Sequence, residues 1–156
     1  MITYRIATLD DCATLTQIRM DNINKYLQNA TEDEMETLRK NIYQHFTHDM
    51  NEGTLITYVA CDGDKIVGTC GLTFFNATPS PTNITGKQGY ITNMYTDPEY
   101  RGRGVGTKLF ALTKEAAIAR NCGRLVLYKT KMAEGIYKKF GFEDSIGYMT
   151  WSEVHT

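Results

Sequence analysis

The chain has 156 residues, of which 42% are hydrophobic and 22% are charged, and its formal net charge is −1. These values are typical of one globular domain, predicted to cover residues 1–156, and the balanced charge argues against a nucleic-acid-binding protein. No apolar stretch reaches the ~20 residues of a transmembrane helix, and the first residues lack a signal-peptide core, so no membrane role is expected. The four cysteines are scattered without a CxxC pair, which predicts no metal site and a reducing, cytoplasmic setting.

The first half of the chain predicts a strand, two helices and a β-hairpin. The second helix has the clearest start, because Thr31 followed three positions later by Glu34 is a capping-box pattern. Asp62-Gly63-Asp64 is typical of a hairpin turn between two runs rich in strand-forming residues. The predicted elements are a strand at 4–7, a helix from Asp10 or Asp11 toward 26, a helix from 31 to about 48, and strands at 55–61 and 65–75.

The second half alternates strands and helices around a glycine-rich loop. Residues 76–88 are rich in Asn, Pro, Ser, Thr and Gly and therefore predict a loop. The elements that follow are a strand at 89–96, a helix at 105–120, a strand at 124–128, a helix at 132–140 and a final strand region at 142–151. The predicted order of elements is β-α-α-β-β-β-α-β-α-β.

The glycine-rich loop is the strongest functional signal in the chain. Its glycines occupy every second position, at Gly102, Gly104 and Gly106. Glycine tolerates positive φ and the close approach of a ligand, and a helix start offers free N–H groups with a partial positive charge. With Arg101 and Arg103 beside them, these features predict an anion-binding site. The GxGxG spacing differs from both the GxGxxG dinucleotide fingerprint and the Walker loop.

Three segments, in order, carry a resemblance to a known family. They are the strand at 90–96 followed by Asp97-Pro98, then Arg101-Gly102-Arg103-Gly104-Val105-Gly106, then Ile136-Tyr137-Lys138-Lys139-Phe140-Gly141-Phe142. The second fits a Q/R-x-x-G-x-G/A signature, and the third is similar to an LYxxxGF segment. In these motifs the chain resembles the GNAT superfamily of acetyl-CoA-dependent N-acetyltransferases. The resemblance implies an α/β (α+β) GNAT fold, with a mixed central sheet of six to seven strands and about four helices.

The resemblance also implies where acetyl-CoA binds as co-substrate. Its pyrophosphate lies on the glycine loop and its pantetheine arm lies along the preceding strand, where the amide of Tyr95 or a neighbour stabilises the oxyanion. Tyr137 is the implied catalytic residue, whose phenol donates to the departing CoA thiolate. Lys129-Thr130 stand where the family often has Asn, which affects one cofactor contact. The implied cofactor-binding residues are Met94, Tyr95, Thr96, Arg101, Gly102, Arg103, Gly104, Val105, Gly106 and Thr107.

The group that removes the proton of the acceptor amine stays open at this level. Many family members place a Glu on the strand before the glycine loop, whereas residues 89–96 contain no carboxylate. Asn93 lies on that strand, but an amide is not a base near neutral pH. A chain of water molecules is an alternative to the remaining side-chain candidates, which are Glu32, Glu34, Glu134, Glu153 and His155.

The motifs together predict an N-acetyltransferase that moves the acetyl group of acetyl-CoA to a primary amine of a small molecule or peptide, by direct attack in a ternary complex. One alternative is a non-catalytic acetyl-CoA-binding sensor or regulatory domain, and another is a protein N-terminal or lysine acetyltransferase. A homodimer is expected because family members often dimerise through their C-terminal strands. His45 and His48 share a helix face, but no third metal ligand is evident and no metal is expected.

Overall fold

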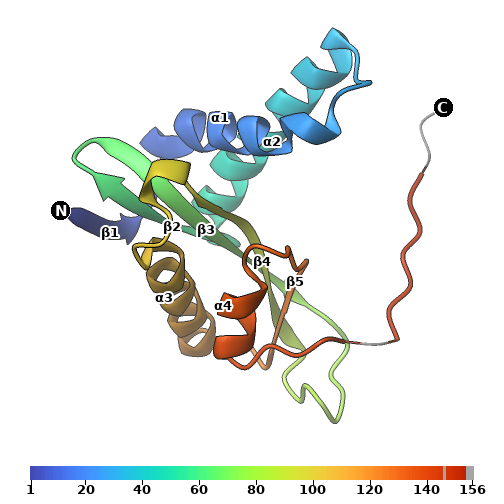
Figure 1. Cartoon of the computed structure of the whole chain (residues 1–156). Coiled ribbons are helices and arrows are strands. Elements are labelled where there is room, and N and C mark those ends of the chain that lie inside the picture. The colour runs from blue at the N-terminus through green and yellow to red at the C-terminus, as the bar shows by residue number, and fades with distance from the viewer. Residues whose placement is uncertain (146, 154–156) are drawn as a thin grey trace.

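The computed structural model describes residues 1–145 and 147–153. A central β-sheet with helices on both faces organises the chain (Figure 1). The principal elements are β1 (Ile2–Ile6), α1 (Cys12–Ile23), α2 (Glu32–Glu52), β2 (Leu55–Asp62), β3 (Lys65–Asn76), β4 (Lys87–Thr96), α3 (Val105–Ala119), β5 (Arg124–Leu127) and α4 (Glu134–Lys139). Short 3₁₀ turns occur at Leu9–Asp11, Asn24–Tyr26 and Pro98–Tyr100. This succession confirms the predicted order from the first strand to the last helix.

The sheet contains five strands in the order β1-β2-β3-β4-β5. The strands from β1 to β4 pair antiparallel, whereas β4 and β5 pair parallel. The parallel pair follows from the chain path, because α3 connects the two strands and returns the chain to the end where β4 began. The glycine loop consequently lies at the carboxyl end of β4, between that strand and α3.

Side chains that alternate along the strands enter two cores, one on each face of the sheet. Val59 of β2 packs in the core with Phe46 of α2, whereas the adjacent Ala60 belongs to the core with Phe110 of α3. The ring of Phe110 lies 5.5, 5.1 and 5.4 Å from the rings of Tyr137, Phe140 and Phe142. These aromatic contacts fix α4 and the residues after it against α3.

The start of α2 has the capping geometry that the sequence predicts. The backbone amide of Glu34 donates to Thr31 Oγ1 at 3.2 Å, and the amide of Thr31 donates to the Glu34 carboxylate at 2.8 Å. The helix ends at Gly53, whose φ of 75° suits a residue without a Cβ. Asp11 is the N-cap residue of α1, as expected, but its side chain makes no capping hydrogen bond to that helix, because its carboxylate accepts from Arg5 at 2.7 Å instead. None of the helices described is both long and apolar enough to cross a membrane.

The predicted sheet of six to seven strands is too large by at least one strand. The expected final strand at 142–151 does not form, since none of its described residues pairs with the sheet. A strand needs a neighbouring ladder, and the left-handed φ values of 85° at Gly141 and 104° at Gly147 interrupt extended backbone. In Figure 1 this segment runs away from the sheet. Its large apolar side chains are exposed, at 65% for Tyr148, 97% for Met149 and 87% for Trp151.

Candidate active site

The second half of β4 has one edge with no strand beside it. The ladder with β5 ends at Ile91. Asn93 then adopts a left-handed φ of 53° near a register shift in the β3–β4 pairing. A 2.6 Å hydrogen bond from Thr69 Oγ1 to the Asn93 carbonyl oxygen holds this irregularity. An extended ligand can therefore pair with the open backbone groups that follow, which belong to Met94, Tyr95 and Thr96.

The glycine loop takes its shape from two residues in the left-handed region. Gly102 has a φ of 73° and Gly104 a φ of 79°, and a Cβ added at either would meet nothing within 4 Å. Glycine is thus needed at both positions for backbone conformation and not for packing. Gly106 differs, because its ideal Cβ would lie 3.5 Å from Ile136, Met94 and Thr96 side-chain atoms. The loop is therefore open to solvent at Gly102 and Gly104, whereas side chains pack against it at Gly106.

The loop directs the first amides of α3 toward open space. The helix begins at Val105, and the residue before it, Gly104, has no side chain to cap it. The first hydrogen bond of the helix runs from the Lys108 amide to the Gly104 carbonyl oxygen, at 3.0 Å. The amides of Val105, Gly106 and Thr107 therefore precede the hydrogen-bonded part of the helix. Such a helix start, with its partial positive charge, is suited to bind a phosphate without a metal.

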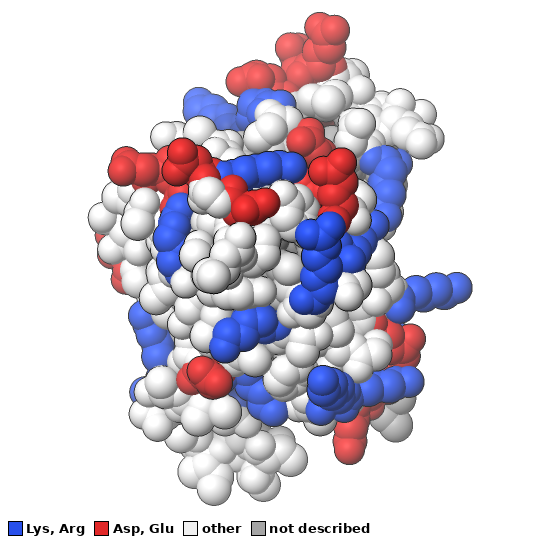
Figure 2. Space-filling view, turned by 60° about the vertical axis from the view of Figure 1, so that its left-hand side comes forward, with Lys and Arg blue, Asp and Glu red and all other residues white. Residues whose placement is uncertain are grey.

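Two arginines add positive charge to this helix start. Arg101 donates from Nε to the Thr96 carbonyl oxygen at 3.1 Å, and the Arg103 guanidinium lies 5.2 Å from the centre of the Tyr100 ring. Neither arginine forms an ion pair with a carboxylate in the described part of the chain. Over the face drawn in Figure 2, Lys and Arg occur among Asp and Glu without a continuous basic band. The loop is thus a local anion site within a surface of mixed charge.

A hollow of about 290 Å³ joins the open edge of β4 to the glycine loop. Nine of the eleven site residues expected from the resemblance line it, and the two that do not are Arg103 and Tyr137. Burial raises the pKa of the Tyr95 phenol, which lies in this wall. The nine lining residues are Met94, Tyr95, Thr96, Arg101, Gly102, Gly104, Val105, Gly106 and Thr107.

Six further residues line the hollow that sequence reasoning did not assign to it. Tyr100 directly precedes the loop motif, and the resemblance covers Ile136 and Thr130 without assigning either a role in the site. Asn22 has no signal in the sequence, because it comes from the end of α1 and only the tertiary fold brings it there. The six residues are Asn22, Tyr100, Thr130, Met132, Ala133 and Ile136.

Tyr137 is buried behind the wall formed by its neighbours on α4. It is 6% exposed, and its ring lies 5.5 Å from the Phe110 ring. Burial raises the pKa of its phenol, while a hydrogen bond with Thr130 has the opposite effect on that pKa. The phenol is therefore protonated at neutral pH and adjoins a residue that lines the hollow.

Among the residues that the structure describes, no carboxylate lines the hollow. Glu134 lies 3.2 Å from Lys138 and 3.6 Å from Lys129, which lower the pKa of its carboxyl. Glu32 and Glu34 belong to the first turn of α2, and Glu153 is exposed. His155 lies outside the described residues. The side-chain Oδ1 of Asn93 is buried and has no hydrogen-bond partner in the described structure.

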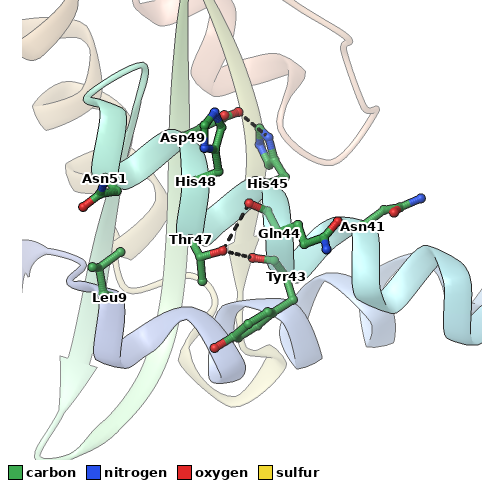
Figure 3. A pocket seen from close by; sticks show the side chains of 9 residues that line it. All are labelled: Leu9, Asn41, Tyr43, Gln44, His45, Thr47, His48, Asp49 and Asn51. Carbon is green, nitrogen blue, oxygen red and sulfur yellow. Dashed lines mark hydrogen bonds and ion pairs between the residues drawn. The ribbon is translucent and has the colours of Figure 1, made fainter.

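A larger surface hollow, of about 820 Å³, lies over the outer face of α2 (Figure 3). It contains His45 and His48, the pair whose spacing raised the question of a metal. His45 Nδ1 lies 2.6 Å from the Asp49 carboxylate. Within residues 1–145 and 147–153, no group of three His, Cys, Asp or Glu side chains is arranged to hold a metal ion. None of the motif residues lines this hollow, so it is separate from the glycine-loop site.

Comparison with known proteins identifies the family to which this chain belongs. The model of the acetyltransferase (GNAT) family matches residues 16–142. Thialysine N-epsilon-acetyltransferase of Bos taurus is 35% identical over 53% of this chain and 47% of that protein. N-alpha-acetyltransferase 30 of Schizosaccharomyces pombe is 28% identical over 70% of each chain.

A solved structure extends the similarity to almost the whole chain. The crystal structure of a predicted acetyltransferase with acetyl-CoA from Clostridium acetobutylicum has a TM-score of 0.87 and 29% identity, and the match covers 97% of this chain and 96% of that one. The chain spans about half or less of the length of the thialysine N-epsilon-acetyltransferases that it matches, at 47%, 37% and 37%. The family model, by contrast, covers the strands from β2 to β5, the glycine loop and α4 together. The chain belongs to the acetyltransferase (GNAT) family.

Proposed function

We propose that this protein is an N-acetyltransferase that transfers the acetyl group of acetyl-CoA to a primary amine of a small molecule or peptide. The observation that carries the proposal is the uncapped start of α3 behind two left-handed glycines, next to the open edge of β4. This arrangement offers phosphate-binding amides and a strand edge for an extended amide-containing arm in one hollow. Acetyl-CoA has both groups.

The residues of the hollow fit the parts of acetyl-CoA. The amides of Val105, Gly106 and Thr107 hold the pyrophosphate, supported by Arg101, while Met94 and Tyr95 offer backbone groups to the pantetheine arm. The helix dipole and the amides supply positive potential without a metal. The structure of the predicted acetyltransferase from Clostridium acetobutylicum, which was solved with acetyl-CoA, supports the same ligand.

The reaction is a direct acyl transfer in a ternary complex. The nitrogen lone pair attacks the thioester carbonyl, a C–N bond forms, the C–S bond breaks, and the CoA thiolate leaves. The nitrogen then loses a second proton to water and becomes the amide. A backbone amide at Tyr95 or a neighbour stabilises the oxyanion. Tyr137 donates a hydrogen bond to the thiolate, because burial raises the pKa of its phenol and keeps it protonated.

The acceptor amine must be neutral before it attacks, and a free alkyl amine has a pKa near ~10. No carboxylate of residues 1–145 or 147–153 lines the hollow, so water removes the proton and passes it to bulk solvent. The relatives support transfer to nitrogen, since they include a thialysine N-epsilon-acetyltransferase and an N-alpha-acetyltransferase. Because these acceptors differ from each other, the proposal stays at the level of a primary amine.

A non-catalytic acetyl-CoA sensor is the second candidate, and the absence of a carboxylate from the lining residues favours it. Release of free CoA from acetyl-CoA, measured across amines, polyamines, aminoglycosides and peptides, distinguishes the two. An N-acetyltransferase releases CoA in proportion to an acetylated amine seen by mass spectrometry. Binding of acetyl-CoA with no turnover on any acceptor favours the sensor, and failure to bind acetyl-CoA refutes both.

A homodimer and a cytoplasmic location complete the proposal. The exposed Tyr148, Met149 and Trp151, together with the unpaired outer edge of β5, support association of two chains through the C-terminal segment. Sedimentation of the full chain beside a Trp151→Ser variant tests this, and a monomeric wild-type protein contradicts it.

The proposed cytoplasmic location rests on the cysteines. All four are free, which supports a reducing compartment.

A further inference from the structure

The β2–β3 hairpin contacts the segment just before the glycine loop through two polar side-chain contacts. Tyr100 Oη donates to the Asp62 carboxylate at 2.7 Å, and Lys65 Nζ lies 2.8 Å from the Asp97 carboxylate. The pairs are 38 and 32 residues apart in sequence, so each connects elements that only the fold brings together. The backbone adds a third contact, from the Asp97 amide to the Val67 carbonyl oxygen at 2.8 Å. The hairpin thereby sets the position of the residues that lead into the loop.

Tyr100 is the member of this group that faces the ligand site. It lines the hollow, and its ring lies 5.2 Å from the Arg103 guanidinium and 5.5 Å from Lys65 Nζ. A cation over an aromatic ring keeps its charge and its hydrogen-bond donors, whereas a carboxylate partner would neutralise it. Among the described residues Arg103 has no carboxylate partner, so its donors remain free for an anion.

We propose that Tyr100 is a positioning residue that acts through Arg103. Asp62 fixes the phenol, the ring holds the Arg103 guanidinium at the rim of the glycine loop, and the guanidinium binds a phosphate of coenzyme A. The two loop arginines therefore have different supports: Arg101 is held by the Thr96 carbonyl oxygen at 3.1 Å and Arg103 by an aromatic ring. This inference rests on the proposed function, because it assumes that the loop binds coenzyme A.

Two substitutions of Tyr100 distinguish its hydrogen bond to Asp62 from its ring contact with Arg103. Tyr100→Phe removes only the hydroxyl that Asp62 fixes, and Tyr100→Leu also removes the ring over which Arg103 lies. Asp62→Asn weakens the same anchor from the other side. Asp62 also lies 4.0 Å from the N-terminal amine, so agreement between Tyr100→Phe and Asp62→Asn identifies the shared contact.

The test is a double-mutant cycle on the affinity of the full chain for CoA, measured by titration calorimetry. We expect Tyr100→Leu to weaken CoA binding about three- to tenfold and Tyr100→Phe about two- to threefold, in line with an exposed cation–π contact and its anchor. In an Arg103→Met background, the same substitutions change the affinity less than about twofold. Tyr26→Leu is the matched control, because it removes the Lys25–Tyr26 contact of 4.9 Å outside the hollow.

The coupling to Arg103 distinguishes positioning from a general structural role. A Tyr100→Leu effect that persists undiminished in Arg103→Met overturns the proposal, as does wild-type affinity in Tyr100→Leu. If Tyr100→Leu does not fold, Tyr100→Phe and Asp62→Asn carry the same cycle. Repeating the cycle with 3′-dephospho-CoA assigns the phosphate: coupling retained points to the pyrophosphate and coupling lost points to the 3′-phosphate, and either supports the proposal. A wild-type protein that does not bind CoA refutes the proposed function itself, which is a different result from absent coupling.

Discussion

Replacing Gly104 with alanine tests whether the backbone of the glycine loop holds the phosphate. Gly104 has a φ of +79°, and a Cβ built on it meets nothing within 4 Å, so the substitution causes no clash. Its cost is the left-handed conformation of an L-residue, which is about 1 kcal/mol or more relative to glycine. For a chain of this size, that corresponds to a fall in Tm of about 2–4 °C.

The effect on binding is expected to exceed the effect on stability. If the loop keeps its conformation, the new methyl group occupies the open space at the rim of the hollow. If it relaxes, the amides of Val105 and Gly106 turn away from the phosphate. Either response removes charge-assisted contacts, and we expect the Kd for acetyl-CoA to rise at least about tenfold, or about 1.4 kcal/mol.

Gly53→Ala is the control, because Gly53 follows α2 with a φ of +75° and also has nothing within 4 Å of its ideal Cβ. The two substitutions therefore impose nearly the same backbone cost at two helix ends. Thermal unfolding without ligand should show similar losses of Tm, while calorimetry should show weakened acetyl-CoA binding only for Gly104→Ala. Equal acetyl-CoA affinity in the two variants would refute the assignment of the loop amides.

Three further predictions concern catalysis, capping and pH. Tyr137→Phe keeps the aromatic packing and should lower kcat at least about tenfold with little change in acetyl-CoA Kd; an unchanged kcat with a turned-over acceptor removes the assignment. Thr31→Ala deletes the cap of α2 and should lower the free energy of unfolding by about 1 kcal/mol in urea titrations, and a change below the error of the measurement would show that the cap is dispensable. The hydrogen bond from Arg5, with one from the Thr8 amide, lowers the pKa of Asp11 below its ordinary 3.8. That stabilisation is complete above pH 3.8 and is lost as pH falls through the lower folded value. Asp11→Asn should therefore be less stable than wild type at pH 7, with a difference that shrinks in acid, and a constant difference would contradict this.

Local signals predicted the elements that carry their own start and stop. The capping box at Thr31 and the hairpin turn at Asp62-Gly63-Asp64 act over a few residues, so the sequence contains the information for them. The helix after the glycine loop begins at Val105 as expected. The strand expected at 142–151 was wrong, because a strand depends on a partner that can lie anywhere in the chain, and the residues of the segment alone do not supply one.

The candidate site likewise combines residues that the sequence predicts with residues that only the tertiary fold brings to it. Nine of its lining residues lie in two adjacent segments, Met94 to Thr96 and Arg101 to Thr107, where glycine spacing and family motifs are readable in the sequence. Asn22 joins them from α1, and Asp62 reaches Tyr100 from the hairpin. These contacts depend on how the helices and strands pack, and no local pattern encodes them.

The sequence by itself determined the anion-binding loop, and the family motifs around it implied the donor, acetyl-CoA. The glycine spacing specifies a backbone that only glycine adopts readily, and that backbone directs helix amides at an anion. The tertiary structure decided the rest, including the open edge of β4, the burial of Tyr137 and the support of the loop by Asp62 and Lys65. The physical reason is range: a backbone conformation is set within a few residues, whereas burial and polar contacts between distant elements exist only after the sheet and helices have packed.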